Sequence, residues 1–226
     1  MPKKNSVLRL SAAFALSTLL LGALLFIPAG TLNWPEAWLL LALFFCYFAP
    51  AGLWLRKHRP ETAKKRTSLK MPVKNWDAVV VAFMSITLLA VLPIAALDAV
   101  AFRLSAVPLA IKALGFAGVA LSLALMFLAI KENAFASRIV EMQKGQKVIS
   151  TGPYAVVRHP MYTAFSVMVV GIALALGSLY ALLPAVLTII GLVARSVLED
   201  RDLQKGLAGY KEYAKKVRYR LLPWVW

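Results

Sequence analysis

The residues best suited to chemistry lie in a polar segment between two long apolar runs, residues 152–162. Within it, Arg158 and His159 stand directly before an apolar run. On membrane-insertion scales, an arginine surrounded by hydrocarbon costs about 2.5–3.5 kcal/mol. A chain that keeps ionisable side chains at such a place is expected to use them.

The local sequence predicts how this segment enters its helix. Pro160 disfavours the α conformation at His159. It suits the first helical position, where a backbone N–H would have no partner within the helix in any case. The N–H groups of the next three residues would then be unpaired, and we expect them to favour an anionic group. The alternative is a simple turn in which Arg158 reaches lipid phosphates.

A second polar group stands at the end of the last apolar run. Arg195 and Glu199 are four residues apart and share a helix face, and Asp202 lies near that face. The arginine could hold a substrate carboxylate, and the glutamate could hold an ammonium or hydroxyl group of a cofactor. The alternative is a surface ion pair worth a few tenths of a kcal/mol. We expect this group and the 152–162 segment to form one site.

Composition places the chain in a membrane. Of its 226 residues, 61% are hydrophobic, and the net charge is +16. The basic residues fall between apolar runs, which indicates membrane topology and anionic headgroups rather than a nucleic-acid partner. One cysteine and two separated histidines predict neither a disulfide nor a metal site.

The apolar runs predict an all-α fold, a polytopic membrane bundle of about five to six transmembrane helices. We expect residues 1–130 to form N-terminal transmembrane helices and residues 131–226 to form the core that carries the site. The runs cover roughly residues 8–27, 36–55, 77–97, 108–130, 161–176 and 179–197.

Lysine and arginine alternate between the two sides of this bundle. They fill the N-terminal tail, the loops 56–76 and 131–160 and the C-terminal tail, whereas the loop 28–35 has none. Because positive loops stay in the cytosol, both termini and the site are expected there. The tail 210–224 alternates basic and aromatic residues and is expected to lie at the membrane surface, which is compatible with its also covering the site as a lid.

Three motifs together resemble the superfamily of isoprenylcysteine carboxyl methyltransferases and phospholipid methyltransferases. The resemblance covers roughly residues 130–224. The motifs are Gly152-Pro153-Tyr154 with Arg158-His159-Pro160-Met161-Tyr162, then Arg195-x-x-x-Glu199-Asp200, then Gly209-Tyr210-x-x-Tyr213.

This resemblance implies that S-adenosylmethionine binds on the cytosolic side, with Arg195 near a substrate carboxylate and Glu199 at the cofactor. Relatives often carry two adjacent glutamates where this chain has Glu199-Asp200, which leaves the role of Asp200 open. The role of Glu141 is open as well. The implied cofactor-binding residues are Gln146, Lys147, Val148, Ile149, Tyr154, His159, Pro160, Met161, Tyr162 and Glu199.

The resulting hypothesis is a membrane methyltransferase that uses S-adenosylmethionine to methylate a carboxylate or thiol of an isoprenyl-bearing or lipid-like acceptor, with Arg195 and Glu199 as the catalytic pair. Methyl transfer needs positioning and a poorly hydrated nucleophile more than acid–base groups. We expect membrane lipids as surroundings and no obligate protein partner. The alternatives are a phospholipid N-methyltransferase, a membrane reductase that uses NADPH, and a transporter or scaffold without turnover.

Overall fold

The computed structural model describes residues 4–67, 74–137, 139–141 and 143–226, with side chains described from residue 15 onward except at 65 and 67. These residues form helices and no strand, which confirms the all-α prediction. The elements are α1 (Lys4–Ala29), α2 (Pro35–His58), α3 (Pro60–Thr67), α4 (Asn75–Ala96), the π-helical turn η1 (Leu97–Ala101), α5 (Leu109–Glu132), the 3-10 turn η2 (Gly152–Ala155), α6 (Pro160–Ala175), α7 (Leu182–Gly206) and α8 (Tyr210–Lys216).

Within the described part of the chain, four helical stretches are long and apolar enough to cross a membrane: α2, α4 with η1, α5 and α7. Two shorter apolar stretches, Ala15–Ala29 of α1 and Pro160–Ala175 of α6, accompany them. Large apolar side chains such as Leu19, Ile86 and Leu121 point outward and are exposed. Exposed side chains of this kind suit contact with hydrocarbon, and the polytopic membrane bundle predicted from the sequence is the fold observed.

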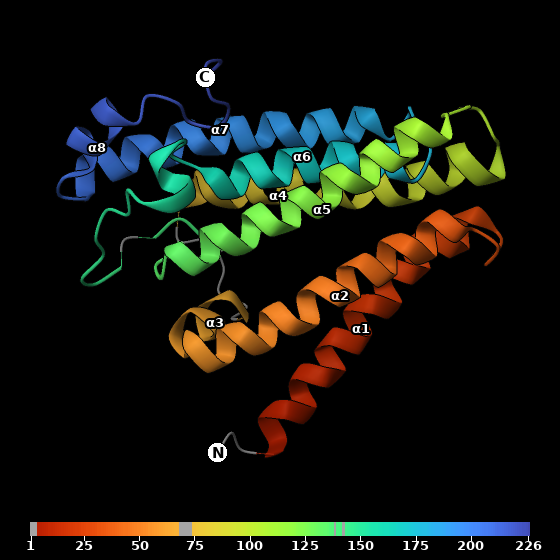
Figure 1. Ribbon diagram of the computed structural model, residues 1–226, viewed down its shortest axis with the longest axis horizontal. Coiled ribbons are helices and arrows are strands. Elements are labelled where there is room, and N and C mark those ends of the chain that lie inside the picture. Colours follow the sequence, from red (N-terminus) through yellow and green to blue (C-terminus); the bar gives the residue numbers. More distant parts are fainter. Residues whose placement is uncertain (1–3, 68–73, 138, 142) are drawn as a thin grey trace.

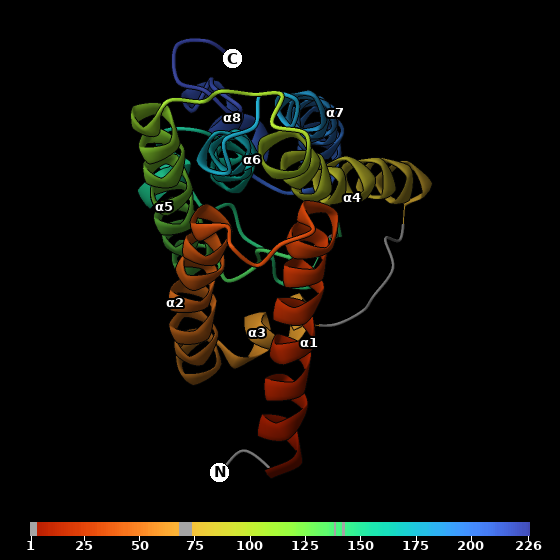
Figure 2. The ribbon, with the colours of Figure 1, turned by 90° about the vertical axis from the view of Figure 1, so that its right-hand side faces the viewer.

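Helices α4 to α7 form the packed part of the bundle, and α1 and α2 lie against one side of it (Figures 1 and 2). α5 runs along α6, and α4 runs along α7. α5 and α6 approach each other closely, since a Cβ on Gly115 would lie 2.4 Å from the backbone nitrogen of Ala175 and 2.8 Å from the carbonyl oxygen of Gly171. Small residues allow such contact between helix backbones in membranes.

One end of the bundle gathers the segments that carry the site. α3, the 133–159 segment and α8 all lie there (Figure 1). α7 continues to Gly206, past the end of the apolar run near residue 197, so that Arg195 and Asp200 stand on one uninterrupted helix, as the shared helix face of Arg195 and Glu199 requires. α3 is a further difference, since the sequence treats residues 56–76 as a loop. The division of the chain at residue 130 stays a prediction.

Candidate active site

All ten residues expected at a cofactor line a single cavity at this end of the bundle, with a volume of about 130 Å³. They come from the extended stretch 146–149, from the segment 154–162 and from α7. The first two stretches are neighbours in sequence, and the fold brings them against α7, which lies much further along the chain. The ten residues are Gln146, Lys147, Val148, Ile149, Tyr154, His159, Pro160, Met161, Tyr162 and Glu199.

The wall formed by residues 133–149 holds its shape through its own amide groups. The backbone N–H of Phe135 donates to the side-chain oxygen of Asn133 at 2.9 Å, and the Gln143 side chain donates to the Phe135 carbonyl at 2.8 Å. The side-chain oxygen of Gln146 accepts the Gln143 N–H at 2.9 Å. Gln143 therefore stabilises the loop, whereas the nearby Glu141 lines the cavity.

The start of α6 differs from the expectation of an anion-binding helix end. Pro160 does occupy the first position, but the carbonyl of His159 accepts the N–H groups of Tyr162 and Thr163 at 2.9 and 3.1 Å. Two of the three N–H groups expected to be unpaired are thus satisfied within the turn. Arg158 does not reach toward lipid either, because its side chain is buried and pairs with Asp200.

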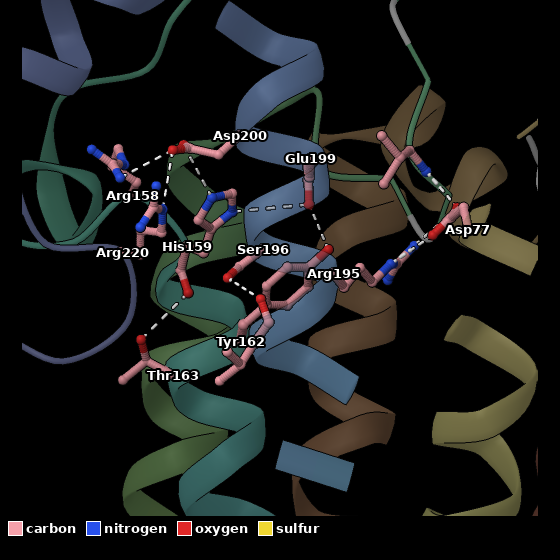
Figure 3. A network of polar contacts seen from close by, with 12 residues as sticks. Asp77, Arg158, His159, Tyr162, Thr163, Arg195, Ser196, Glu199, Asp200 and Arg220 are labelled. Atoms are coloured by element: carbon pink, nitrogen blue, oxygen red, sulfur yellow. Dashed lines mark hydrogen bonds and ion pairs between the residues drawn. The ribbon is translucent and has the colours of Figure 1, made fainter. Parts of the chain in front are cut away.

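Asp200 is the centre of a buried polar network (Figure 3). Its side chain is 1% exposed and lies 3.0 Å from Arg158 and 3.2 Å from Arg220. The Tyr210 hydroxyl donates to it at 2.7 Å, and Nε2 of His159 lies 3.5 Å away. A single carboxylate on α7 thereby joins the 152–162 segment, α8 and the tail, which gives Asp200 a structural role that the sequence left open.

The C-terminal tail folds back against the site. The backbone N–H groups of Arg158 and His159 donate to the carbonyls of Tyr219 and Arg220, both at 3.0 Å. Arg158 also donates from its guanidinium to the carbonyl of Val217 at 3.2 Å. This placement brings the tail next to the site, as a cover over the site requires, and it is compatible with a tail at the membrane surface.

Glu199 faces the cavity beside two stacked rings. The Tyr162 hydroxyl donates to its carboxylate at 2.6 Å, and Nδ1 of His159 lies 3.9 Å from it. The His159 and Tyr162 rings are parallel within 5°, with centroids 5.4 Å apart. The Glu199 side chain is 23% exposed, so its carboxylate is accessible from the cavity.

Arg195 does not line the cavity and instead pairs with a residue that sequence reasoning missed. Its Nε and NH2 groups donate to the carboxylate of Asp77 at 2.8 and 3.3 Å, and Asp77 is fully buried. The guanidinium carbon lies 5.7 Å from the centre of the Tyr162 ring. Asp77 also accepts the backbone N–H of Val140, a cavity residue, at 3.1 Å. A carboxylate in the first turn of an apolar run is the sequence signal that could have identified it.

Three tyrosines beside the cavity have phenols whose pKa is raised. Burial raises the pKa of Tyr154 to about 12. Burial and the carboxylate of Asp200 raise the pKa of Tyr210, and burial together with Tyr154 raises that of Tyr213. The Tyr213 hydroxyl donates to the carbonyl of Tyr154 at 2.7 Å. These phenols remain neutral hydrogen-bond donors at physiological pH.

Because the folded-state pKa of Tyr154 is raised from 10.0 to about 12, its burial stabilises the fold fully below pH 10 and loses that contribution as the pH rises toward 12. We expect an absorbance titration of phenolate to show that Tyr154→Phe removes a component that titrates near pH 12. Tyr180→Phe, at an exposed position, is the control and should leave that component in place. Loss of a component that titrates near pH 10 in the Tyr154 variant would contradict the burial argument.

The chemistry available here is that of charge and positioning. The cavity carries carboxylates from Glu141, Glu199 and Asp202 and ammonium groups from Lys74 and Lys147. Within the described ranges, no three His, Cys, Asp or Glu side chains gather in a way that could hold a metal ion, and the absence of a metal site stays a prediction. Carboxylates, ammonium groups and aromatic rings around one enclosure suit a ligand that carries both charged groups and a ring.

Comparison with known families agrees with the geometry. Residues 110–208, from the start of α5 to just past α7, match the family model described as phospholipid methyltransferase. A search of curated proteins finds no match. The matched region holds the 152–162 segment, Arg195 and Glu199, whereas Asp77 lies before it. Over these residues the chain is therefore similar to the superfamily of integral-membrane methyltransferases that includes the phospholipid and isoprenylcysteine carboxyl methyltransferases.

Proposed function

We propose that this chain transfers a methyl group from S-adenosylmethionine to a lipid-like acceptor in the cavity beside His159 and Glu199. The observation that carries the proposal is the convergence of all ten residues implied by the family resemblance on one cavity. The donor set suits the cofactor. A sulfonium is positively charged, and the cavity offers the Glu199 carboxylate beside the Tyr162 ring.

Bound S-adenosylmethionine would supply an electrophilic methyl group attached to sulfur. The Glu199 carboxylate balances positive charge in the site, and Tyr162 orients that carboxylate through its hydrogen bond. His159 stacks on Tyr162 and limits its rotation. Tyr210 and Tyr213 line the cavity and bring the tail to it, which reduces access of water to the reacting groups.

A lipid-like acceptor is supported by an apolar groove on the membrane face of the bundle. The groove has a volume of about 710 Å³, lies along α6 between α5 and α7, and is lined almost entirely by apolar side chains. Thr163 lines the groove, and its neighbour Tyr162 lines the cavity. A hydrocarbon chain lying there would place its head group near the cavity.

A second candidate is N-methylation of a phospholipid amine, favoured by the state of Arg195. A guanidinium that already donates two hydrogen bonds to Asp77 has less capacity to hold a substrate carboxylate. Glu199 does face the cavity, and its carboxylate complements an amine. Comparing an aminophospholipid with an isoprenylated cysteine as acceptor would separate the two reactions.

We place the cavity and both termini on the cytosolic side. The basic α3 and the 133–159 segment lie at the same end of the bundle as α8 (Figure 1). Lys211, Lys215 and Lys216 add positive charge at that end. Positive segments are retained in the cytosol, where S-adenosylmethionine would reach the cavity from water and the acceptor from the bilayer.

The direct test is equilibrium binding of labelled S-adenosylmethionine to purified protein, with NADPH as competitor. We expect S-adenosylmethionine to bind and NADPH not to displace it. Glu199→Gln should weaken this binding roughly 10- to 100-fold, because a hydrogen bond or ion pair to a charged group is worth about 1.5–3 kcal/mol.

The matched control is Glu212→Gln, which removes an exposed carboxylate from α8 and should leave the affinity unchanged. Displacement by NADPH would support a reductase instead. Binding of neither compound, with no methyl transfer to any lipid acceptor, would favour a transporter or scaffold.

A further inference from the structure

The cavity wall also carries a pair of opposite charges that belongs neither to the Asp200 network nor to the Arg195–Asp77 pair. Nζ of Lys74, the residue before α4, lies 2.5 Å from the carboxylate of Asp202 on α7. Both residues line the cavity. Lys74 lies outside the region matched by the phospholipid methyltransferase family.

The exposure of this pair distinguishes it from the ion pairs that hold the fold together. Arg195 with Asp77 and Arg158 with Asp200 are nearly fully buried, whereas the Lys74 and Asp202 side chains are 36% and 26% exposed. An ion pair with that exposure contributes only about 0–1 kcal/mol to stability. Its two charges are accessible from the cavity, and either can accept a further partner of opposite sign.

The other charged groups of the cavity are less suited to an amino-acid group. Arg158 is buried against Asp200, and Glu199 receives the Tyr162 hydroxyl. Lys147 lines the cavity but is exposed to solvent on the extended stretch. Lys74 and Asp202 offer an ammonium and a carboxylate side by side, which is the charge pattern complementary to an α-amino-acid zwitterion.

The spacing along α7 agrees with the length of the cofactor. Asp202 stands three residues beyond Glu199, about one helical turn, or roughly 5 Å, further along the same face. In S-adenosylmethionine two methylene groups separate the sulfonium from the amino-acid carbon. A sulfonium beside Glu199 therefore leaves the amino-acid end within reach of Asp202 and Lys74.

We propose that Lys74 and Asp202 bind the amino-acid end of the cofactor, with the Lys74 ammonium on its carboxylate and the Asp202 carboxylate on its ammonium. This inference rests on the proposed function, since it concerns the same cavity. It assigns a role in cofactor selection to a residue of the N-terminal half. The site then discriminates against adenosine thioethers that lack either charge.

The test measures affinities of the purified full chain for S-adenosylhomocysteine, for its decarboxylated analogue and for its deaminated analogue. Wild-type protein should bind the complete compound roughly 10- to 100-fold more tightly than either analogue. Lys74→Gln should abolish the preference over the decarboxylated analogue, because the carboxylate no longer has a partner. Lys74→Arg should retain most of that preference.

Asp202→Asn provides the complementary measurement, in which the preference over the deaminated analogue should disappear. Lys205→Gln, on an exposed part of the same helix, is the control and should leave all three affinities unchanged. An unaltered preference in Lys74→Gln, or its loss in Lys147→Gln instead, overturns the inference while the proposed function stands. If wild-type protein binds neither S-adenosylmethionine nor these compounds, the proposed function is wrong and the inference falls with it.

Discussion

Asp200→Asn is expected to lower the free energy of unfolding by about 3–5 kcal/mol, the range for breaking a buried ion pair by removal of one partner. The carboxylate of Asp200 is 1% exposed and balances both Arg158 and Arg220. Without it, the buried Arg158 guanidinium keeps its positive charge and has lost the carboxylate that offsets its desolvation. For a chain of this length, such a loss corresponds to a decrease of about 6–20 °C in Tm.

Thermal unfolding in detergent, followed by circular dichroism, measures this decrease. The matched control is Glu212→Gln, which neutralises an exposed carboxylate on α8 and should leave the Tm unchanged. Since Asp200 also receives the Tyr210 hydroxyl, the variant should lose the fixed position of α8, detectable as faster proteolysis of the tail. A Tm within about 2 °C of the wild type corresponds to a loss of at most about 1 kcal/mol and would show that the network contributes little to stability.

The second large effect concerns the pair between α4 and α7. Asp77→Asn and Arg195→Met should each destabilise the protein by about 3–5 kcal/mol, because each leaves a buried charge without its partner. The double variant should be destabilised by less than the sum of the two, since no unpaired charge remains. We expect a coupling of about 1–3 kcal/mol between the two positions.

The same cycle tests whether Arg195 also acts on the substrate. If it only holds α4 against α7, the double variant should recover turnover along with stability. If it also holds an acceptor carboxylate, the double variant should stay inactive toward that acceptor while it still binds S-adenosylmethionine. Additive destabilisation by the two single variants would contradict the pairing itself.

The helices of the membrane bundle could be predicted because hydrocarbon requires continuous apolar stretches with internally paired backbones. α3 could not, since it is short and polar and packs outside the apolar core: the Thr62 hydroxyl donates to the Ala134 carbonyl at 2.9 Å. The apolar pattern also stops before the end of α7, which continues to Gly206. Glu199 and Asp200 end the apolar pattern, but the helix continues because their side chains are satisfied by the 152–162 segment and the tail.

The site was predictable only where neighbouring residues carry its signal. The segment around His159 and the Arg195/Glu199 spacing each identify one wall of the cavity. Lys74 carries no local signal of this kind, and the position of Asp77 signals only a buried charge, because their partners Asp202 and Arg195 lie on a helix far along the chain. No periodicity within α4 indicates that its first turn meets α7. Such pairings depend on helix packing, which the sequence pattern leaves undetermined.

The contact between Gly115 and Gly171 constrains how an acyl chain can lie in the apolar groove. With a Cβ on either residue expected 2.8–2.9 Å from a carbonyl oxygen across the contact, α5 and α6 adjoin there without space for an acyl chain between them. An acyl chain in the groove therefore lies over this seam rather than between the two helix backbones. The tail residues Leu221 and Trp226 also line the groove, and the Leu221 carbonyl accepts the Thr163 hydroxyl at 2.6 Å, so the tail bounds the groove at the end nearer the cavity.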